Sequence, residues 1–277
     1  MHRNRTPRRG RRLAAVLLAG ALATTGLTAL AQSASAGNPA PAAEPAQGSP
    51  GSVVEIPMAT ADEVVEETIP ITEDFDGGGT RYIPGDGLGG GDQDEDQLPV
   101  FEVSDGATLS NVIIGSPGAD GIHCEGDCTL ENVYWENVGE DAATFRNGST
   151  YNVVGGGAVG ADDKVLQFNG GGTLNIRNFE AEDFGTLVRS CGNCSSMSQR
   201  TIVLDGVTAV APGNIIAGIN ENYGDTATFS NITVVGDSEM TVCQRYIGND
   251  DGDEPEESGS GPDGTHCRYD ESDISYQ

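Results

Sequence analysis

Short runs of apolar, β-branched residues recur along this chain at a regular interval, and they limit the folds that it can adopt. Most runs end alike, with a bulky apolar residue, then polar residues or Gly, then Val or Ile. They lie at Leu109–Val112, Leu130–Val133, Leu174–Ile176, Leu204–Val207 and Phe229–Ile232, and a weaker copy covers Tyr151–Val154. An interval of roughly 20 to 30 residues is the period of a solenoid rung.

This period predicts an all-β fold class, a single-domain right-handed parallel β-helix (β-solenoid). Each rung of such a fold points alternate branched side chains inward, turns at Gly, Asn or Asp, and stacks on the next rung. The composition agrees, because the chain has 40 glycines and only 5% aromatic residues. In addition, no long stretch has the periodicity of an amphipathic helix.

The first 36 residues have the pattern of a secretion signal peptide. Six arginines precede an apolar run from Leu13 to Leu30, and Ala34-Ser35-Ala36 fits the rule for signal cleavage. A membrane anchor is the competing interpretation, but the run is interrupted by Gly and Thr and leads at once to the cleavage site. We therefore expect a secreted, extracellular protein with no membrane segment in its mature form. The general and twin-arginine export routes both remain open.

Two further segments follow the signal. Residues 37–59 are rich in Pro, Ala and Gly and lack a core pattern, which predicts a linker. Residues 60–277 are long enough for one β-helix domain. Because closed solenoids with capped ends are often monomers, and the tail after Cys243 is suited to cap one end, we expect a monomer.

Removal of the signal makes the chain strongly acidic. Six of the 14 Lys and Arg residues lie in the signal, whereas all 43 Asp and Glu residues follow it. The mature chain therefore carries 8 basic and 43 acidic side chains, a net charge near −35, and its only lysine is Lys164. Such a surface repels phosphates and excludes nucleic acid as a partner. It also predicts salt adaptation, with stability and activity that increase with added salt.

Six cysteines in an exported chain predict disulfides. Proximity in the sequence suggests the pairs Cys124 with Cys128, Cys191 with Cys194, and Cys243 with Cys267. The C-x-x-C of the second pair could also be a redox or zinc site. Zinc would need two such pairs or several histidines, and a redox motif would need a helix after a strand. Neither is evident, so structural disulfides are favoured.

Acidic residues fall at the same place in successive rungs. Asp120 is followed twenty residues later by Glu140 and Asp141, and Asp162-Asp163-Lys164 comes one rung further on. Stacked residues of a solenoid lie about 4.8 Å apart, so these carboxylates would repel one another unless they share protons or a cation. Oxygen ligands in an extracellular protein favour Ca²⁺. The alternative is that each acid only caps a turn, but three in register beside the only lysine favour a metal site.

Lys164 is the strongest candidate for a catalytic group. A lysine acts as a base only when its pKa is depressed, and a bound cation together with Arg189 is expected to depress it. A lysine base paired with a divalent cation is suited to remove a proton α to a carboxylate. The alternative, an ordinary surface lysine, is weaker in a mature chain that has no other.

The same residues carry a family resemblance that covers the chain from about 66 to 270. The motifs are DGGG at 76–79, DEDQLPVFEVSDGATLSNVIIG at 94–115, ADGIHC at 119–124, CTLENVYWENVGEDAATF at 128–145, D-K-V-x-Q-x-N within 163–169, RSCGNC at 189–194 and GINENYGDTA at 218–227. Together they resemble pectate lyases of polysaccharide lyase family 3.

The resemblance implies a calcium-dependent pectate lyase that cleaves polygalacturonate, the de-esterified form of pectin, by β-elimination. It implies a parallel β-helix with Ca²⁺ bound at Asp120, Glu140 and Asp141. It also implies catalytic or substrate roles for Lys164 and Arg189, and a substrate role for Glu95.

One position departs from the family pattern. The family commonly has a lysine three residues before the arginine of RSCGNC, and here that position is Thr186. If the family's base is that lysine, this chain would be slow or inactive. If the base is the residue at Lys164, only substrate binding weakens, and this is the interpretation that we adopt.

Two other functions remain open at this stage. The chain could be a non-catalytic or degenerate β-helix that binds pectin in the presence of Ca²⁺ without cutting it. It could also be a glycoside hydrolase that uses carboxylate pairs such as Glu140-Asp141 and Asp162-Asp163, although the motifs favour this function least. A hydrolase would form saturated products and would remain active after chelation.

Overall fold

A computed structural model describes residues 54–94 and 96–277, all within the compact unit Gly48–Gln277. The predicted secretion signal, most of the predicted linker and Glu95 lie outside the described residues. The described residues contain twenty strands, no α-helix, and two short 3₁₀ turns at Glu221–Tyr223 and Glu271–Asp273. None of their helices is long and apolar enough to span a membrane.

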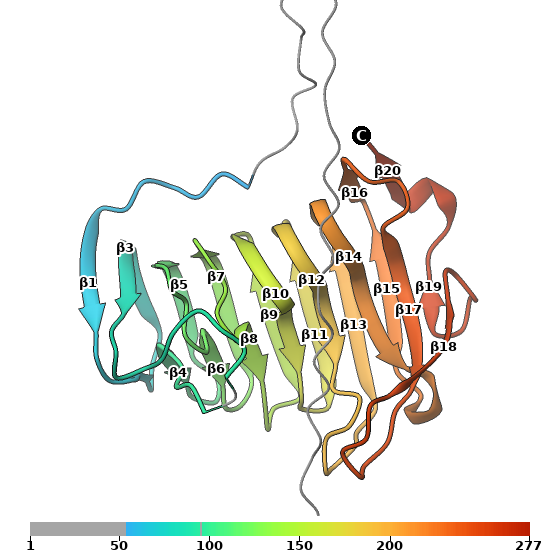
Figure 1. The fold of residues 1–277 in the computed structure, drawn as a ribbon, viewed down its shortest axis with the longest axis horizontal. Coiled ribbons are helices and arrows are strands. Elements are labelled where there is room, and N and C mark those ends of the chain that lie inside the picture. The colour runs from blue at the N-terminus through green and yellow to red at the C-terminus, as the bar shows by residue number, and fades with distance from the viewer. Residues whose placement is uncertain (1–53, 95) are drawn as a thin grey trace, which may run out of the picture. The chain divides into compact units, whose positions relative to one another are not determined.

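The parallel pairings group the strands into three sheets that run along the molecule. Figure 1 shows the strands stacked in chain order. Sheet 1, which carries the site, consists of β2 (Ile69–Ile71), β4 (Phe101–Val103), β6 (Ile122–Cys124), β8 (Asp141–Phe145), the C-terminal parts of β10 (Gly157–Phe168), β12 (Glu180–Ser190) and β14 (Thr208–Asn220), and β17 (Thr241–Ile247).

Sheets 2 and 3 complete each rung. Sheet 2 consists of the first parts of β3 (Phe75–Pro84), β5 (Thr108–Ile114) and β7 (Cys128–Trp135), followed by β9 (Thr150–Val154), β11 (Gly172–Arg177), β13 (Arg200–Asp205), β15 (Thr226–Ser230) and β19 (Cys267–Arg268). Sheet 3 consists of β1 (Ala61–Val65), the last parts of β3, β5 and β7, the first parts of β10, β12 and β14, then β16 (Ile232–Val235) and β20 (Ile274–Tyr276).

The recurring apolar runs lie where sheet 2 turns into sheet 3. Their inward side chains form one continuous buried stack in register, made of Leu109, Leu130, Val153, Ile176, Leu204 and Phe229. Burial of each such side chain stabilises the fold by roughly 1.5–3 kcal/mol. The predicted all-β parallel β-helix is therefore confirmed, and so is the interval between rungs that the sequence suggested.

Asparagines lie within these runs or shortly after them, because the chain must turn sharply there. Asn111, Asn132, Asn178 and Asn231 all have φ between 52° and 53°, a left-handed conformation that Asn tolerates better than most residues. The first two also bond along the stack, since Asn132 Nδ2 donates to Asn111 Oδ1 at 3.3 Å. The turn is thus fixed both within each rung and between rungs.

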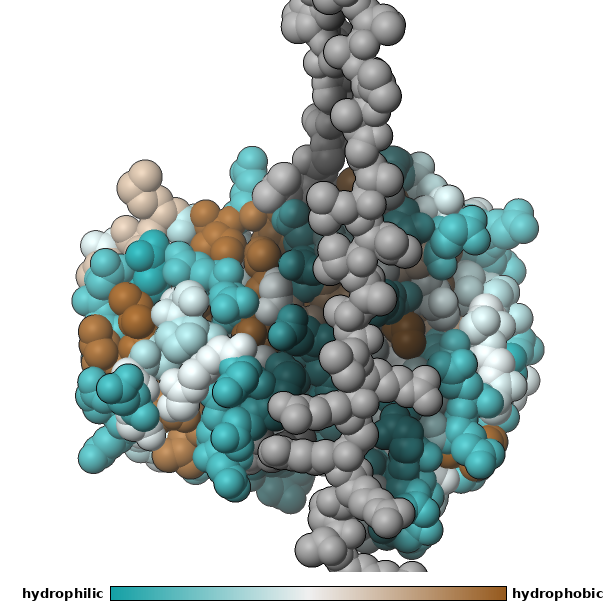
Figure 2. Space-filling model, in the orientation of Figure 1, coloured by the Kyte–Doolittle hydropathy of each residue, from teal (hydrophilic) through white to brown (hydrophobic). Residues whose placement is uncertain are grey.

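Hydrophilic residues cover much of the face seen in Figure 2, and hydrophobic side chains show there only in separate small patches. At the C-terminal end, β18 (Glu256–Ser260) is the one strand of the described chain that pairs antiparallel, and it lies against β17. This hairpin gives the edge of sheet 1 a partner within the chain, which limits pairing with other molecules.

All three predicted disulfides are present: Cys124–Cys128, Cys191–Cys194 and Cys243–Cys267. The third joins β17 of sheet 1 to β19 of sheet 2 across 24 residues, and it holds the C-terminal rung together.

Loss of this third disulfide is expected to destabilise the protein more than loss of the first. By the chain-entropy relation, a loop of this length contributes about 3.5 kcal/mol, whereas the short Cys124–Cys128 loop contributes about 2 kcal/mol. Thermal unfolding of the double-serine variants at each pair measures the difference, and the Cys124/Cys128 variant is the matched control because its cysteines are also buried. Equal losses would show that the C-terminal rung contributes little to stability.

Candidate active site

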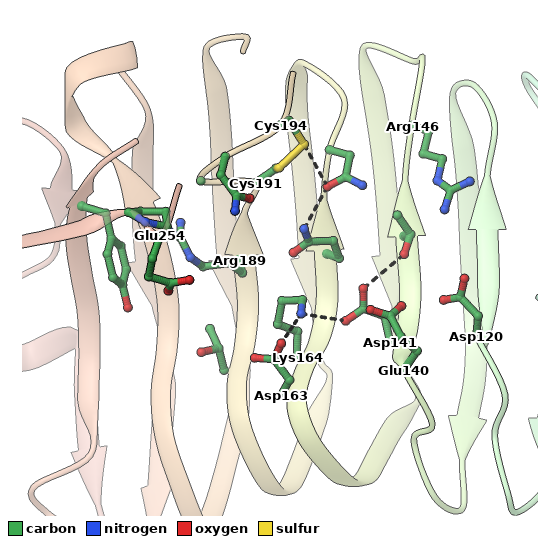
Figure 3. A pocket seen from close by; sticks show the side chains of 18 residues that line it. Asp120, Glu140, Asp141, Arg146, Asp163, Lys164, Arg189, Cys191, Cys194 and Glu254 are labelled. Carbon is green, nitrogen blue, oxygen red and sulfur yellow. Dashed lines mark hydrogen bonds and ion pairs between the residues drawn. A yellow bond between two sulfur atoms is a disulfide. The ribbon is translucent and has the colours of Figure 1, made fainter. Parts of the chain in front are cut away.

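One cavity of about 540 Å³ over sheet 1 brings together nearly all of the residues that the sequence indicated. Asp120, Glu140, Asp141, Lys164 and Arg189 line it, and Figure 3 shows their side chains directed toward the same side of the sheet. Thr186 also lines this cavity.

The register of sheet 1 explains why residues from different rungs meet. Asp141 on β8 pairs with Lys164 on β10, which pairs with Thr186 on β12. Three residues further along each strand, Thr144, Gln167 and Arg189 pair in the same way and form a second row. Because neighbouring parallel strands lie about 4.8 Å apart, each row sets its side chains at a fixed spacing along the cavity.

The carboxyl groups of the site lie in surroundings that disfavour their ionised forms. Glu140 is 8% exposed and Asp141 is 2% exposed. Burial raises the pKa of Glu140, and the neighbouring charges of Asp141 and Asp120 raise it further. Burial also raises the pKa of Asp141, despite the opposing effect of Lys164. In the protein alone, these acids therefore resist simultaneous ionisation.

Two of the carboxylate oxygens fit a cation. Asp120 Oδ1 and Asp141 Oδ1 are buried and have no hydrogen-bond partner among the described residues. The described chain does not, however, contain a group of three or more His, Cys, Asp or Glu side chains that would enclose a metal ion. Ca²⁺ accepts six to eight oxygen ligands and often takes several of them from water or substrate. The donor set therefore fits a Ca²⁺ ion whose coordination is completed from outside the protein.

A histidine orients Asp120. His123 is buried, and its Nε2 lies 2.7 Å from Asp120 Oδ2, a carboxylate oxygen that can only accept. We therefore assign the hydrogen to Nε2, so the contact between this atom and Arg146 Nη2 at 3.1 Å is not a hydrogen bond. The bond occupies Oδ2 and leaves Oδ1 of Asp120 without a hydrogen-bond partner among the described residues.

Lys164 lies between two carboxylates. Its Nζ is 3.7 Å from Asp141 Oδ1 and forms a closer ion pair with Asp163, and its side chain is only 15% exposed. Burial lowers the pKa of Lys164, but Asp141, Asp163 and Glu140 together outweigh burial and raise it. The depressed pKa that the sequence predicts belongs to the site with a bound cation, so it stays a prediction; in the chain alone, the neighbouring carboxylates outweigh burial.

Arg189 is held by both polar and aromatic contacts. Its Nη1 donates to Ser190 O at 2.6 Å and to Asn220 Oδ1 at 3.3 Å, and its guanidinium lies 4.0 Å from the ring centroid of Tyr246. Gly218 provides the space, since a Cβ there would come within 2.8 Å of Arg189 Cδ. Nη1 donates both of these hydrogen bonds, so the Nε–Nη2 edge stays available to a carboxylate.

Several cavity residues were given no role from the sequence: Thr144, Gln167, Tyr246 and Glu254. A signal existed for the first two, because each lies three residues after a candidate residue, as Arg189 lies three residues after Thr186. Tyr246 and Glu254 lie far from the motifs along the chain, and only the folded register places them here.

Comparison with known proteins identifies the family of the chain. The pectate lyase family model matches residues 53–253. The chain belongs to the pectate lyase family. Pectate lyase H of Emericella nidulans is 50% identical over 219 residues, which cover 78% of this chain and 83% of that protein. A probable pectate lyase D from the same fungus is 48% identical, with 77% and 82% covered.

Solved structures of pectate lyases have the same fold. The catalytic domain of pectate lyase PelI from Erwinia chrysanthemi is 34% identical and superposes with a TM-score of 0.66, which covers 79% of this chain and 98% of that domain. PelI has also been solved in complex with tetragalacturonic acid, at 35% identity and a TM-score of 0.65, over 77% of this chain and 70% of that one.

Proposed function

We propose that this chain is a Ca²⁺-dependent pectate lyase that cleaves polygalacturonate by β-elimination and releases 4,5-unsaturated oligogalacturonides. The observation that carries the proposal is the cavity over sheet 1. It holds Lys164 between Asp141 and Asp163, and it presents a free edge of Arg189 from the next rung. Membership of the pectate lyase family supports the same conclusion.

Asp120, Glu140 and Asp141 would hold the Ca²⁺ ion, with the two oxygens that lack a hydrogen-bond partner as the first donors. The bound ion supplies positive charge that neutralises these acids and polarises the carboxylate of the substrate. Among the interactions that raise the pKa of Lys164, the one with Asp141 is the largest, and neutralisation of Asp141 would remove it. Burial would then lower the pKa of Lys164 with less opposition.

The side chains of the chain then perform the elimination. Neutral Lys164 accepts the C5 proton of a galacturonate residue. The electrons of the C5–H bond form the C4–C5 double bond, the C4–O4 bond breaks, and the departing oxygen takes a proton from solvent. Arg189 binds the carboxylate through its Nε–Nη2 edge and stabilises the negative charge that develops there.

A direct test follows the ultraviolet absorbance of the unsaturated product while purified protein is incubated with polygalacturonate. Absorbance that rises with Ca²⁺ and is lost with chelator supports the lyase. Reducing ends without absorbance would show a hydrolase, and retained binding without any product would show a pectin-binding protein.

Thr186→Lys tests the one position that departs from the family pattern. Thr186 lies in register beside Lys164 and lines the cavity. An added ammonium group there is expected to lower KM for polygalacturonate by roughly 3- to 10-fold, because a partly exposed ion pair contributes on the order of 1 kcal/mol, and to leave kcat nearly unchanged. Thr186→Met, similar in length but uncharged, is the control.

A different result would assign the catalytic base to another residue. If Thr186→Lys raises kcat by orders of magnitude, and the variant stays active after Lys164→Ala, then position 186 carries the catalytic base and the natural chain is a weak enzyme or a binder.

We also propose the boundaries and the location of the active protein. Residues 1–36 would be removed on export, residues 37–59 would act as a linker, and residues 60–277 would form the catalytic domain as a secreted monomer. Mass spectrometry of the exported protein would locate its first residue.

A further inference from the structure

A buried polar network lies directly behind Arg189, and none of its members lines the cavity. Asn220, Asp225 and Arg200 are each completely buried. They come from the end of β14, from the turn after it, and from β13. Buried polar groups of this kind are costly unless all their hydrogen bonds are made, so their arrangement is fixed.

Arg200 anchors the network. Its side chain donates to four backbone carbonyls: Gly170 O, Cys191 O, Ser198 O and Asn169 O. Its backbone N–H donates to Asp225 Oδ1 at 2.8 Å. Burial raises the pKa of Asp225, and the hydrogen bonds from the backbone of Asn220 and Arg200, together with the charge of Arg200, oppose this rise.

Asp225 in turn fixes the orientation of Asn220. Asp225 Oδ2 accepts from the backbone N–H of Asn220 at 3.0 Å and from its Nδ2 at 3.2 Å. A carboxylate can only accept, so it selects the NH₂ side of the Asn220 amide. Cys191 O, another acceptor, lies 2.9 Å from the same Nδ2. A flipped amide would lose both of these bonds.

The amide oxygen of Asn220 is therefore directed at Arg189, and it accepts from Nη1. With Ser190 O on the same nitrogen and Tyr246 against the guanidinium plane, the arginine has one orientation. Without the Asn220 acceptor, Nη1 would lose one of its two bonds, and the Nε–Nη2 edge could rotate away from the substrate carboxylate.

We propose that Asn220 is a positioning residue for the Arg189 guanidinium, and that Asp225 acts one step behind it by fixing the Asn220 amide. The inference rests on the proposed function, because it assumes that Arg189 binds the carboxylate of a galacturonate residue.

A double-mutant cycle separates positioning from simple support of the fold. Asn220→Ala is expected to lower kcat/KM for polygalacturonate by roughly 10- to 100-fold, since a misplacement of about 1 Å at a reacting group costs up to about 100-fold. In the Arg189→Lys background, the same change is expected to cost less than about 2-fold, because the bond it supports is already absent. Asn222→Ala is the matched control: it lies in the same turn and bonds only Gly248, so activity should be retained.

Asp225→Asn provides a second variant of nearly unchanged shape, and it decides the question if Asn220→Ala fails to fold by circular dichroism. Its loss of activity should also disappear in the Arg189→Lys background. Equal losses in both backgrounds, or full activity of Asn220→Ala, would overturn the proposal.

The wild-type assay reports separately on the proposed function. If wild-type protein forms no unsaturated product with Ca²⁺, the lyase assignment fails. The same cycle is then measured on the dissociation constant for polygalacturonate by affinity electrophoresis, and non-additive losses there would still support the positioning role.

Discussion

Lys164→Ala is expected to lower kcat for polygalacturonate cleavage by roughly 10²- to 10⁴-fold, the contribution of a positioned general base. The reason is geometric as well as chemical. Lys164 is the only lysine in the chain, and its Nζ lies within a cavity otherwise lined mainly by acidic and neutral side chains, between Asp141 and Asp163. Absorbance of the unsaturated product measures the loss.

Lys164→Arg is the matched control for this prediction. Arginine retains the positive charge beside Asp141 but stays protonated and cannot accept the C5 proton. If Lys164 is the base, both variants are nearly inactive while binding of polygalacturonate persists in Lys164→Arg. If the arginine variant keeps a tenth or more of the wild-type kcat, the lysine contributes charge alone and the base lies elsewhere.

The second large effect is expected at the carboxylates. Chelation of divalent cations should abolish activity, and Asp141→Asn should raise the Ca²⁺ concentration needed for half-maximal activity at least 10-fold. Asp141 is almost fully buried and its Oδ1 has no hydrogen-bond partner in the described chain, so it is the donor with the least access to water. Loss of one charged ligand weakens such a site strongly.

Thermal unfolding gives a readout that does not depend on catalysis. Binding of Ca²⁺ to the folded state should raise the unfolding temperature of the wild type, and less so that of Asp141→Asn. Asp127→Asn is the control, because Asp127 accepts from Ser149 N and Thr150 N at a turn and does not line the cavity. A wild-type unfolding temperature that does not respond to Ca²⁺ would contradict the metal site.

The fold could be predicted because its determinants repeat within short stretches of sequence. The Leu130–Val133 run and the turn at Asn132 together indicate the conformation of one rung, and the same pattern recurs in the next rung. The disulfides could be paired for a similar reason, since Cys124 with Cys128 and Cys191 with Cys194 are close in the chain. Cys243 with Cys267 was suggested because the two bracket the acidic C-terminal loop, and the structure agrees.

The site could be predicted only where its residues lie one rung apart. Asp120, Asp141 and Lys164 fall at equivalent places in successive rungs, so the sequence brought them together. The surroundings of Lys164 could not be predicted, because its pKa depends on the balance between burial and three carboxylates. Asn220 and Tyr246 were missed because their role depends on contacts with Arg189, which the register of distant strands creates.

The position of Lys164 has a practical consequence for chemical modification. Reagents that acylate primary amines will find only two kinds of target in the chain, the terminal amine and the side chain of Lys164, which lines the cavity. Random coupling to an amine-reactive support would therefore either orient the molecule through its N-terminus or block the cavity. Conversely, the fraction of chains labelled at Lys164, and protected by polygalacturonate, would count the functional molecules in a preparation.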